Sequence, residues 1–313
     1  MLKDMGNNIV SIIITTKNEA SNIENCLKSI LHQTYKHIEI IVIDNASIDQ
    51  TKEIARKYTT SVYDKGPERS AQRNFGVSVS KGEYILYLDA DMILAPYVVE
   101  SCINEMMINT EVVGLYIKEV VLGKSSWSKV RRFERSFYDG TPIDAVRFVK
   151  KEVFLEVKGF DEGMSGVEDW DFNNRVSNIG KLKLIGDWEI CDGLIKADLF
   201  SVEIVRLLLS NGIVPKDIYG KYNNVIFHNE SDFNLSKYLT KKSYYMKDLD
   251  KYVQKWGSDD PVIRKQIGLR YRYFGVFIEN GKWKKLILNP ILAFKMFILR
   301  FMVGIIFLKQ KMY

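Results

Sequence analysis

Cysteine, histidine and proline are scarce in this sequence, and no long polar or low-complexity tract interrupts it. The three cysteines, Cys26, Cys102 and Cys191, lie far apart and form no CxxC pair, which argues against a zinc site and against a disulfide framework. Residues 1–8 contain no apolar stretch of signal-peptide length, so we expect a protein that is not exported. These absences predict a folded, cytoplasmic protein whose cysteines are buried as small apolar side chains.

A net positive charge is confined to the C-terminal end of the chain. Residues 233–313 hold 17 Lys and Arg against 5 Asp and Glu, which leaves residues 1–232 with 28 against 34. The overall charge of +6 therefore hides an acidic body and a strongly basic tail. We predict a boundary near residue 232 between two regions with different tasks.

The body alternates short apolar strands with helical segments. IVSIII at residues 9–14 and HIEIIVID at 37–44 are almost continuously apolar, as expected for parallel strands that are covered on both faces. An amphipathic segment between them completes a strand–helix–strand unit. Further features are predicted strands at 84–88, 111–121 and 225–228 and an insertion at about 191–222. The pattern predicts an α/β fold, with a mostly parallel central sheet and helices on both faces.

Three of the predicted strands end in polar residues, at the edge where ligands bind in open α/β sheets. The first runs into Thr15 and Lys17, the second ends at Asp44, and the third ends in Asp89-Ala90-Asp91. Two carboxylates one residue apart after a buried strand can face one divalent cation that also contacts a diphosphate. The alternatives are that Asp44 caps a following helix and that the Asp-Ala-Asp turn is merely solvated.

A second acidic group, Glu168-Asp169-Trp170-Asp171, follows a glycine-containing loop. Acidic residues also suit the first turn of a helix, so this cluster has a purely structural interpretation. However, Trp170 offers an apolar face on which a substrate ring can stack, and a carboxylate here can act as a general base. Few histidines compete for that task. His32 and His37 fall at the wrong end of the second strand, whereas His228, at the end of the last strand, could bind the cation.

Two arginines, Arg69 and Arg73, lie four residues apart at the start of a predicted helix, on one face. A helix N-terminus with two guanidinium groups suits the diphosphate of a nucleotide. Pairing with Glu68 or with neighbouring surface charges is the alternative interpretation.

Taken in order, these segments make residues 9–230 resemble a family 2 glycosyltransferase with the GT-A fold. The motifs that carry the resemblance are SIIITTKNE, VIDNASIDQT, RSAQRNFG, YLDAD, GFDE followed by GVEDWDFNNR, and FHNE. The resemblance implies an inverting enzyme that uses a nucleotide sugar of the uridine type and a divalent metal, Mn or Mg.

The resemblance also implies roles for the matching residues. Those that would bind the nucleotide are Thr15, Lys17, Asp44, Arg69, Arg73, Asp89 and Ala90, with Thr15 and Asp44 at the base and Asp89 at the ribose. Those that would hold the metal are Asp91 and His228. Asp169 would be the catalytic base, with Glu168 and Trp170 on the acceptor side.

Two departures from the family pattern concern substrate choice. Lys17 stands where many members have tyrosine, and the insertion immediately precedes FHNE. The QxxRW motif of processive polymer synthases is absent, which predicts transfer of a single sugar.

The basic tail predicts three helices, separated by a turn at 257–261 and by Asn289-Pro290. The last, at 290–308, is nearly long enough to cross a bilayer, but Lys295 and Arg300 disfavour a span. We expect it to lie on a membrane surface with both cations reaching the headgroups. Packing on the protein itself is the alternative. Nucleic acid is not expected as a partner, because no nucleic-acid-binding motif accompanies the basic residues.

Together these features predict a peripheral enzyme at the inner face of the cell membrane that glycosylates a lipid-linked or saccharide acceptor. A sugar-nucleotide nucleotidyltransferase is a second hypothesis, although the glycine-rich loop expected after its first strand is missing. A non-catalytic nucleotide-sugar-binding protein is a third, and such a protein has no need of a base at Asp169.

Overall fold

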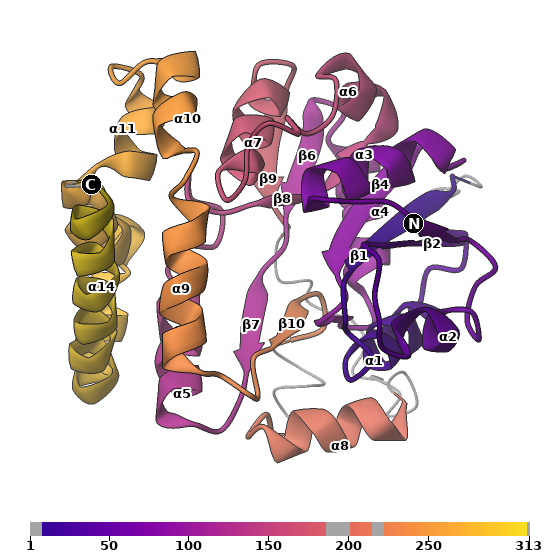
Figure 1. The fold of residues 1–313 in the computed structure, drawn as a ribbon, viewed down its shortest axis with the longest axis horizontal. Coiled ribbons are helices and arrows are strands. Elements are labelled where there is room, and N and C mark those ends of the chain that lie inside the picture. Colours follow the sequence, from indigo (N-terminus) through magenta and orange to yellow (C-terminus); the bar gives the residue numbers. More distant parts are fainter. Residues whose placement is uncertain (1–7, 186–200, 215–221, 312–313) are drawn as a thin grey trace.

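Two sheets form the body of the chain in the computed structural model, which describes residues 8–185, 201–214 and 222–311 (Figure 1). The strands of the larger sheet, in spatial order, are β3 (Val62–Asp64), β2 (Ile38–Asp44), β1 (Val10–Thr16), β4 (Tyr84–Asp89), β8 (Val146–Lys150), β6 (Val112–Tyr116) and β9 (Lys181–Leu184). The smaller sheet contains β5 (Met92–Leu94), β10 (Ile226–Asn229) and β7 (Glu119–Leu122).

Parallel pairing dominates the larger sheet. β1 pairs in parallel with β2 and β4, β2 pairs with β3, and β6 pairs with β9, whereas β8 runs antiparallel to both of its neighbours. Helices cover both faces, because the strands are apolar on both. Ile12 and Ile14 of β1 belong to the core under α1 (Ile23–Leu31), α2 (Thr51–Ala55) and α4 (Val98–Ile108). Ile13 packs on the opposite side, under α3 (Arg69–Val79), α6 (Lys151–Glu156) and α7 (Glu168–Ser177). The predicted α/β architecture is confirmed.

The single strand predicted at 111–121 is wrong. The segment forms two strands, β6 and β7, that pair in different sheets. Both strands are buried and apolar, so hydrophobicity alone did not reveal that the chain changes sheets near Lys118.

Part of the predicted insertion, residues 191–200 and 215–221, lies outside the described residues, as does Cys191. Between these stretches, α8 (Val202–Ser210) begins at Ser201, whose side chain accepts a hydrogen bond from the backbone of Ile204. It buries Ile204 and Leu208 against the core. Cys26 and Cys102 are buried free thiols.

The tail contains more helices than the three predicted. They are α9 (Leu235–Tyr245), α10 (Leu249–Trp256), α11 (Pro261–Ile267), α12 (Val276–Ile278), α13 (Trp283–Leu288) and α14 (Pro290–Lys311), with a π-helical turn at Tyr271–Gly275. Figure 1 shows α9 against the body and α14 outermost. α14 packs on α9 and on α5 (Ser126–Arg135).

The expectation that both cations of the last helix reach membrane headgroups is wrong for Arg300. Its side chain points into the protein, where Nη1 lies 2.9 Å from Oε1 of the buried Glu134. Lys295 donates to Ser126 on α5. One side of α14 therefore packs on the protein itself, as the alternative interpretation predicted. On its other side Ile291, Phe294 and Phe301 remain exposed. Among the described residues, the segment Pro290–Phe307 is the one helix long and apolar enough to cross a membrane, by length and composition only.

Candidate active site

The carboxyl ends of β1, β2 and β4 meet at one edge of the large sheet. The register places Thr16 beside Asp44 and Thr15 beside Asp89. The Thr15 hydroxyl donates to Oδ1 of Asp89 over 3.1 Å. Because neighbouring parallel strands end together, residues more than 70 positions apart in the sequence form one polar surface.

Asp44 is fully buried and accepts hydrogen bonds from the backbone and the hydroxyl of Ser47. It therefore holds the turn after β2. It does not cap the following helix, because α2 begins at Thr51 and its N-cap residue is Gln50. Lys17 is exposed immediately beyond β1. Contact of either residue with a nucleotide stays a prediction.

Two arginines join the strand-end aspartate to the acidic start of α7. Arg69 lies 3.6 Å from Asp89 and 3.0 Å from Glu168. Arg73, one turn later, lies 3.4 Å from Asp89 and 2.8 Å from Asp169. The pair of arginines thus ties two segments that lie some 80 residues apart in the sequence.

The two arginines differ in access. Arg73 is fully buried, and its guanidinium packs against the rings of both Tyr87 and Phe160, 4.8 and 4.9 Å from their centres. The side chain of Arg69 keeps 30% exposure. Arg69 is therefore the more accessible of the two, whereas Arg73 positions the carboxylates. Contact of either arginine with a nucleotide stays a prediction.

Asp91 and His228 come together through the small sheet. β10 pairs antiparallel with β5, which starts immediately after Asp91, and the backbone of Asn229 donates to the Asp91 carbonyl. Nε2 of His228 lies 3.0 Å from Oδ2 of Asp91. Burial acts to lower the pKa of His228, but the carboxylates of Asp91, Glu230 and Glu119 outweigh it and raise that pKa to about 9. Ala90, between the two aspartates, is buried.

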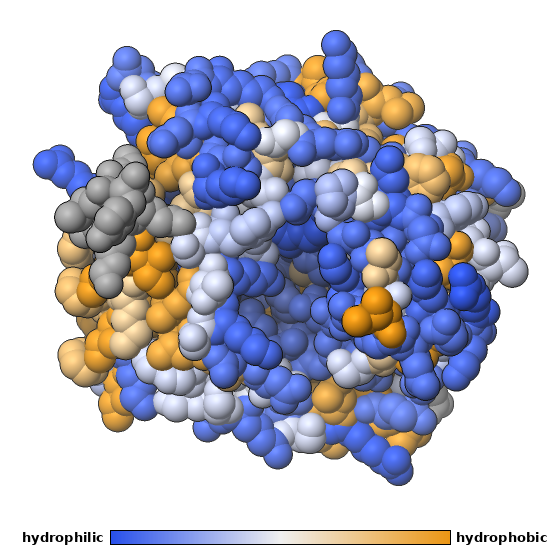
Figure 2. Space-filling view, viewed as in Figure 1, coloured by the Kyte–Doolittle hydropathy of each residue, from blue (hydrophilic) through white to orange (hydrophobic). Residues whose placement is uncertain are grey.

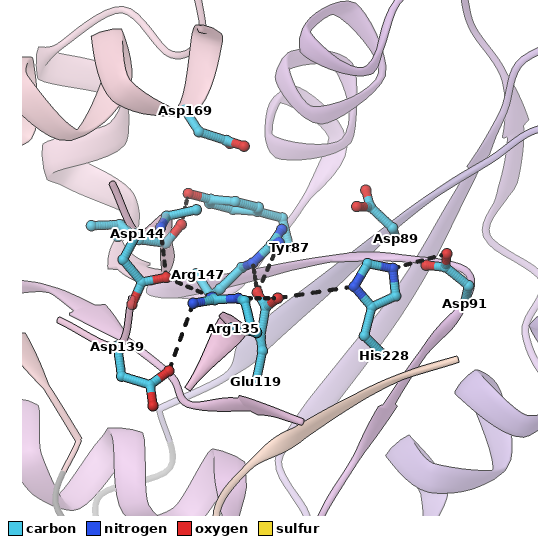
Figure 3. A network of polar contacts seen from close by, with 12 residues as sticks. Tyr87, Asp89, Asp91, Glu119, Arg135, Asp139, Asp144, Arg147, Asp169 and His228 are labelled. Carbon is cyan, nitrogen blue, oxygen red and sulfur yellow. Dashed lines mark hydrogen bonds and ion pairs between the residues drawn. The ribbon is translucent and has the colours of Figure 1, made fainter. Parts of the chain in front are cut away.

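Behind His228 lies a set of buried ion pairs that the sequence did not identify (Figure 3). Nδ1 of His228 is 4.0 Å from Glu119, and Glu119 also binds Arg135 and Arg147. Burial would raise the pKa of Glu119, but the two arginines lower it well below its ordinary range. At 4.0 Å, Glu119 acts on His228 through its charge rather than through a hydrogen bond. Glu119 and Arg147 are charges inside apolar strands, which is the signal that could have revealed them.

The residues at the Asp91 end fit a divalent cation. Oδ1 of Asp91 is buried and has no hydrogen-bond partner among the described residues. Nε2 of His228 lies beside the same carboxylate, and a cation held there would replace the proton of the imidazolium. In the described part of the chain, no three or more His, Cys, Asp or Glu side chains come close enough together to hold a metal ion by themselves. The protein would thus supply one or two ligands and a substrate diphosphate the others, as is usual for Mg²⁺ sites.

The acidic cluster at 168–171 starts α7, as the sequence predicted. The side chain of Asp169 keeps 25% exposure and faces the site, whereas Glu168 is buried. The Trp170 ring is partly buried, donates to the Ile143 carbonyl, and packs near Tyr252 and the Arg272 guanidinium. These contacts give Trp170 a structural task, and its acceptor role stays a prediction.

The chain resembles known glycosyltransferases in sequence and in fold. Residues 11–156 match the family model described as glycosyl transferase family 2. Glycosyltransferase AglE of Haloferax volcanii is 41% identical over 91 residues, which cover 26% of this chain and 30% of that protein. The chain therefore spans less than a third of this curated relative.

Two solved structures share the fold. The mannosyltransferase PcManGT from Pyrobaculum calidifontis, in complex with GDP-Man and Mn²⁺, has a TM-score of 0.52 at 17% identity, and the match covers 91% of this chain and 75% of that one. S. aureus TarS 1-349, in complex with UDP-GlcNAc, has a TM-score of 0.52 at 15% identity, covering 90% and 76%. The sheet order and these matches lead to one assignment: residues 11–156 match the glycosyl transferase family 2 model, and the chain has the GT-A fold.

Proposed function

We propose that the chain is an inverting glycosyltransferase that moves one sugar from a nucleotide sugar, a UDP-sugar by preference, to a hydroxyl of a saccharide or lipid-linked acceptor. The observation that carries this proposal is the convergence of Asp89, Asp91, Asp169 and His228 around the carboxyl end of β4 (Figure 3), since Asp169 and His228 lie beyond the matched residues 11–156. The nucleotide sugars in the two related structures support donors of this class.

In the proposed reaction, Asp169 takes the proton of the acceptor hydroxyl while that oxygen attacks the anomeric carbon. The new C–O bond forms as the bond from the anomeric carbon to the diphosphate oxygen breaks on the opposite side, and the nucleoside diphosphate leaves. Arg73 holds the Asp169 carboxylate in place, 2.8 Å away. A bound Mn²⁺ or Mg²⁺ would stabilise the charge on the leaving diphosphate, and Asp91 and His228 are the residues that would hold it.

We also propose that the enzyme works at the cytoplasmic face of a membrane, where α13 and α14 touch the lipid. Ile287, Ile291, Phe294 and Phe301 are 66–72% exposed. Figure 2 shows apolar side chains gathered on the side of the molecule where α14 lies. Trp283 is also exposed and has Lys284 over its ring, so an aromatic and a cation accompany the apolar face. This combination favours an anionic lipid surface over a protein partner.

The test of the proposed function is a donor screen. The full chain is incubated with UDP-, GDP- and TDP-sugars, with Mn²⁺ or with chelator, and release of nucleoside diphosphate is measured. We expect release with at least one donor and its loss with chelator. Asp169→Asn should lower kcat by about 10²–10⁴-fold while leaving nucleotide binding by thermal shift intact, because the amide keeps the shape of the side chain.

Two results would contradict the proposal. One is the absence of any thermal shift with nucleotides in the presence of metal. The other is full turnover by both Asp169→Asn and Asp91→Ala. Release of pyrophosphate from a nucleoside triphosphate and a sugar phosphate would instead support the nucleotidyltransferase hypothesis.

A further inference from the structure

A pocket of about 250 Å³ lies between the start of α3, the loop before α7, and α9 of the tail. The side chains that matter for its chemistry are Arg69, Met164, Glu168, Lys241, Tyr244 and Tyr245. Arg69 of this lining also lies 3.6 Å from Asp89, so the pocket adjoins the strand-end carboxylates of the candidate active site. The volume is below the roughly 300–1,000 Å³ of pockets that enclose drug-sized ligands, so it suits a single ring.

Glu168 lines this pocket and has one carboxylate oxygen without a hydrogen-bond partner among the described residues. One oxygen, Oε1, accepts from Arg69 over 3.0 Å. The other, Oε2, is buried and has no hydrogen-bond partner among the described residues, although the whole residue is only 2% exposed. A buried acceptor without a donor is costly. Burial, with the adjacent charge of Asp169, raises the pKa of Glu168. A ligand hydroxyl would satisfy this oxygen.

Two tyrosines of α9 form the opposite wall. The Tyr244 hydroxyl donates to Glu68 over 2.5 Å, and the Tyr245 ring lies 5.3 Å from the Arg69 guanidinium. α9 sits directly on the loop, because a Cβ on Gly166 would fall 2.3 Å from the Tyr245 Cα. The tail therefore closes the site rather than standing apart from it.

The charges of the pocket favour a neutral ligand. Glu68 and Glu168 are both carboxylates, and the Arg69 guanidinium already contacts Glu168 and Asp89. Lys241 is the remaining cation of the lining. A phosphate here would face two carboxylates, whereas a sugar ring can donate hydroxyls to them and pack its C–H face on tyrosine.

We propose that this pocket is the subsite for the acceptor sugar, in which a ring hydroxyl donates to Glu168 Oε2 and the ring lies against Tyr244 and Tyr245. This assignment rests on the proposed function, because an acceptor subsite exists only in a transferase. Its consequence is that α9 of the basic tail helps to determine which acceptor is used. A neutral saccharide end group is the part of the acceptor that it recognises.

Saturation-transfer NMR on the full chain tests the subsite directly. The probes are the methyl glycosides of glucose, galactose, mannose and N-acetylglucosamine, each with and without UDP and Mn²⁺. We expect ring protons of at least one glycoside to be saturated. Tyr244→Leu and Glu168→Gln should each weaken that binding by about five- to tenfold. Tyr63→Leu is the matched control, since Tyr63 is 38% exposed on β3 outside the pocket and Tyr244 is 44% exposed.

The subsite is overturned if no glycoside contacts the protein under either condition, or if the binding survives both Tyr244→Leu and Glu168→Gln unchanged. Displacement of the glycoside by inorganic phosphate would also overturn it, because that result marks an anion site. Failure of the proposed function shows separately, as a missing thermal shift with nucleotides, and circular dichroism confirms that each variant is folded.

Discussion

Arg73 binds two acidic segments at once. Replacing it with methionine, which has a similar length but no charge, tests how much its charge contributes to the stability of the fold. In Arg73→Met the carboxylates of Asp89 and Asp169 lose their shared partner. We expect a loss of about 3 kcal/mol in the free energy of unfolding, the low end for breaking a buried ion pair. The low end applies because the two carboxylates keep 20% and 25% exposure. Urea denaturation measures the change.

The matched control is Arg56→Met, at an exposed arginine after α2. It should change stability by no more than about 0.5 kcal/mol. A loss below about 1 kcal/mol in Arg73→Met would mean that the two carboxylates find water or other donors instead.

Single residues at the strand ends were the most predictable part of the site. Asp89 and Asp91 were recognisable because a buried strand ends there, and the registers of β1, β2 and β4 confirm that these strand ends meet. The partners of the two arginines were not predictable. Their spacing of four residues predicts that they share one face of a helix. The surrounding sequence does not indicate that this face contacts α7.

At the scale of elements, Gly166 controls how closely α9 approaches the loop before α7. Its φ is +80°, and an added Cβ would meet the Tyr245 backbone. Gly166→Ala therefore combines backbone strain with a steric clash. We expect it to displace α9, which hydrogen exchange of α9 amides would report as faster exchange.

Gly212→Ala is the control for strain alone. Gly212 also has a φ of +80°, but nothing lies within 4 Å of a Cβ there. Equal effects of the two substitutions on α9 exchange would show that the contact with Tyr245 does not hold the helix.

The exposed side of α14 makes a prediction about membranes. Phe294→Glu and Phe301→Glu should each reduce binding to phosphatidylcholine vesicles that contain phosphatidylglycerol by about tenfold, because burying a phenylalanine is worth roughly 1.5–3 kcal/mol. Co-sedimentation measures the binding. Ile48→Glu, at a 93% exposed isoleucine outside the tail, is the control and should leave vesicle binding unchanged. Equal binding by all four proteins would remove α14 from the membrane interface.

Helices and strands were predictable where the pattern of apolar and polar residues clearly fits one type of secondary structure. The strands at β1, β2 and β4 follow from continuous apolar runs, and the start of α7 follows from its acidic first turn. The change of sheet between β6 and β7 has no such local signal, because both strands are equally apolar. The side chain of Arg300 points into the protein because it binds Glu134, which lies 166 residues away in the sequence. No local pattern predicts such a distant partner.

For the whole molecule, the junction between tail and body makes stability depend on acidity. Burial would raise the pKa of Glu134, but Arg131 and Arg300 outweigh it and lower that pKa from 4.5 to about 2. A lowered carboxyl pKa stabilises the folded state above about pH 4.5, and the contribution disappears as the pH falls towards 2. The loss corresponds to about 3 kcal/mol.

Unfolding of the wild type and of Glu134→Gln between pH 5 and about pH 2.5 tests this dependence. The variant should lose less stability than the wild type over that range, because its side chain cannot take up the proton. Glu53→Gln, at an exposed glutamate of α2, should follow the wild type. Parallel curves for all three proteins would show that Glu134 does not couple the tail to the body.

The small sheet has a consequence for how the chain is made. β10 is its central strand and pairs with β5 and β7, yet it follows β7 by about 100 residues in the chain. At the usual rates of synthesis, about 5–20 residues per second, β10 is synthesised roughly 5–20 s after β7. Until then, β5 and β7 lack the strand that pairs with both of them. During that interval two short apolar edges are open to other chains, and His228 has not yet reached Asp91. Newly made protein should therefore depend on chaperones that shield strand edges until β10 has emerged.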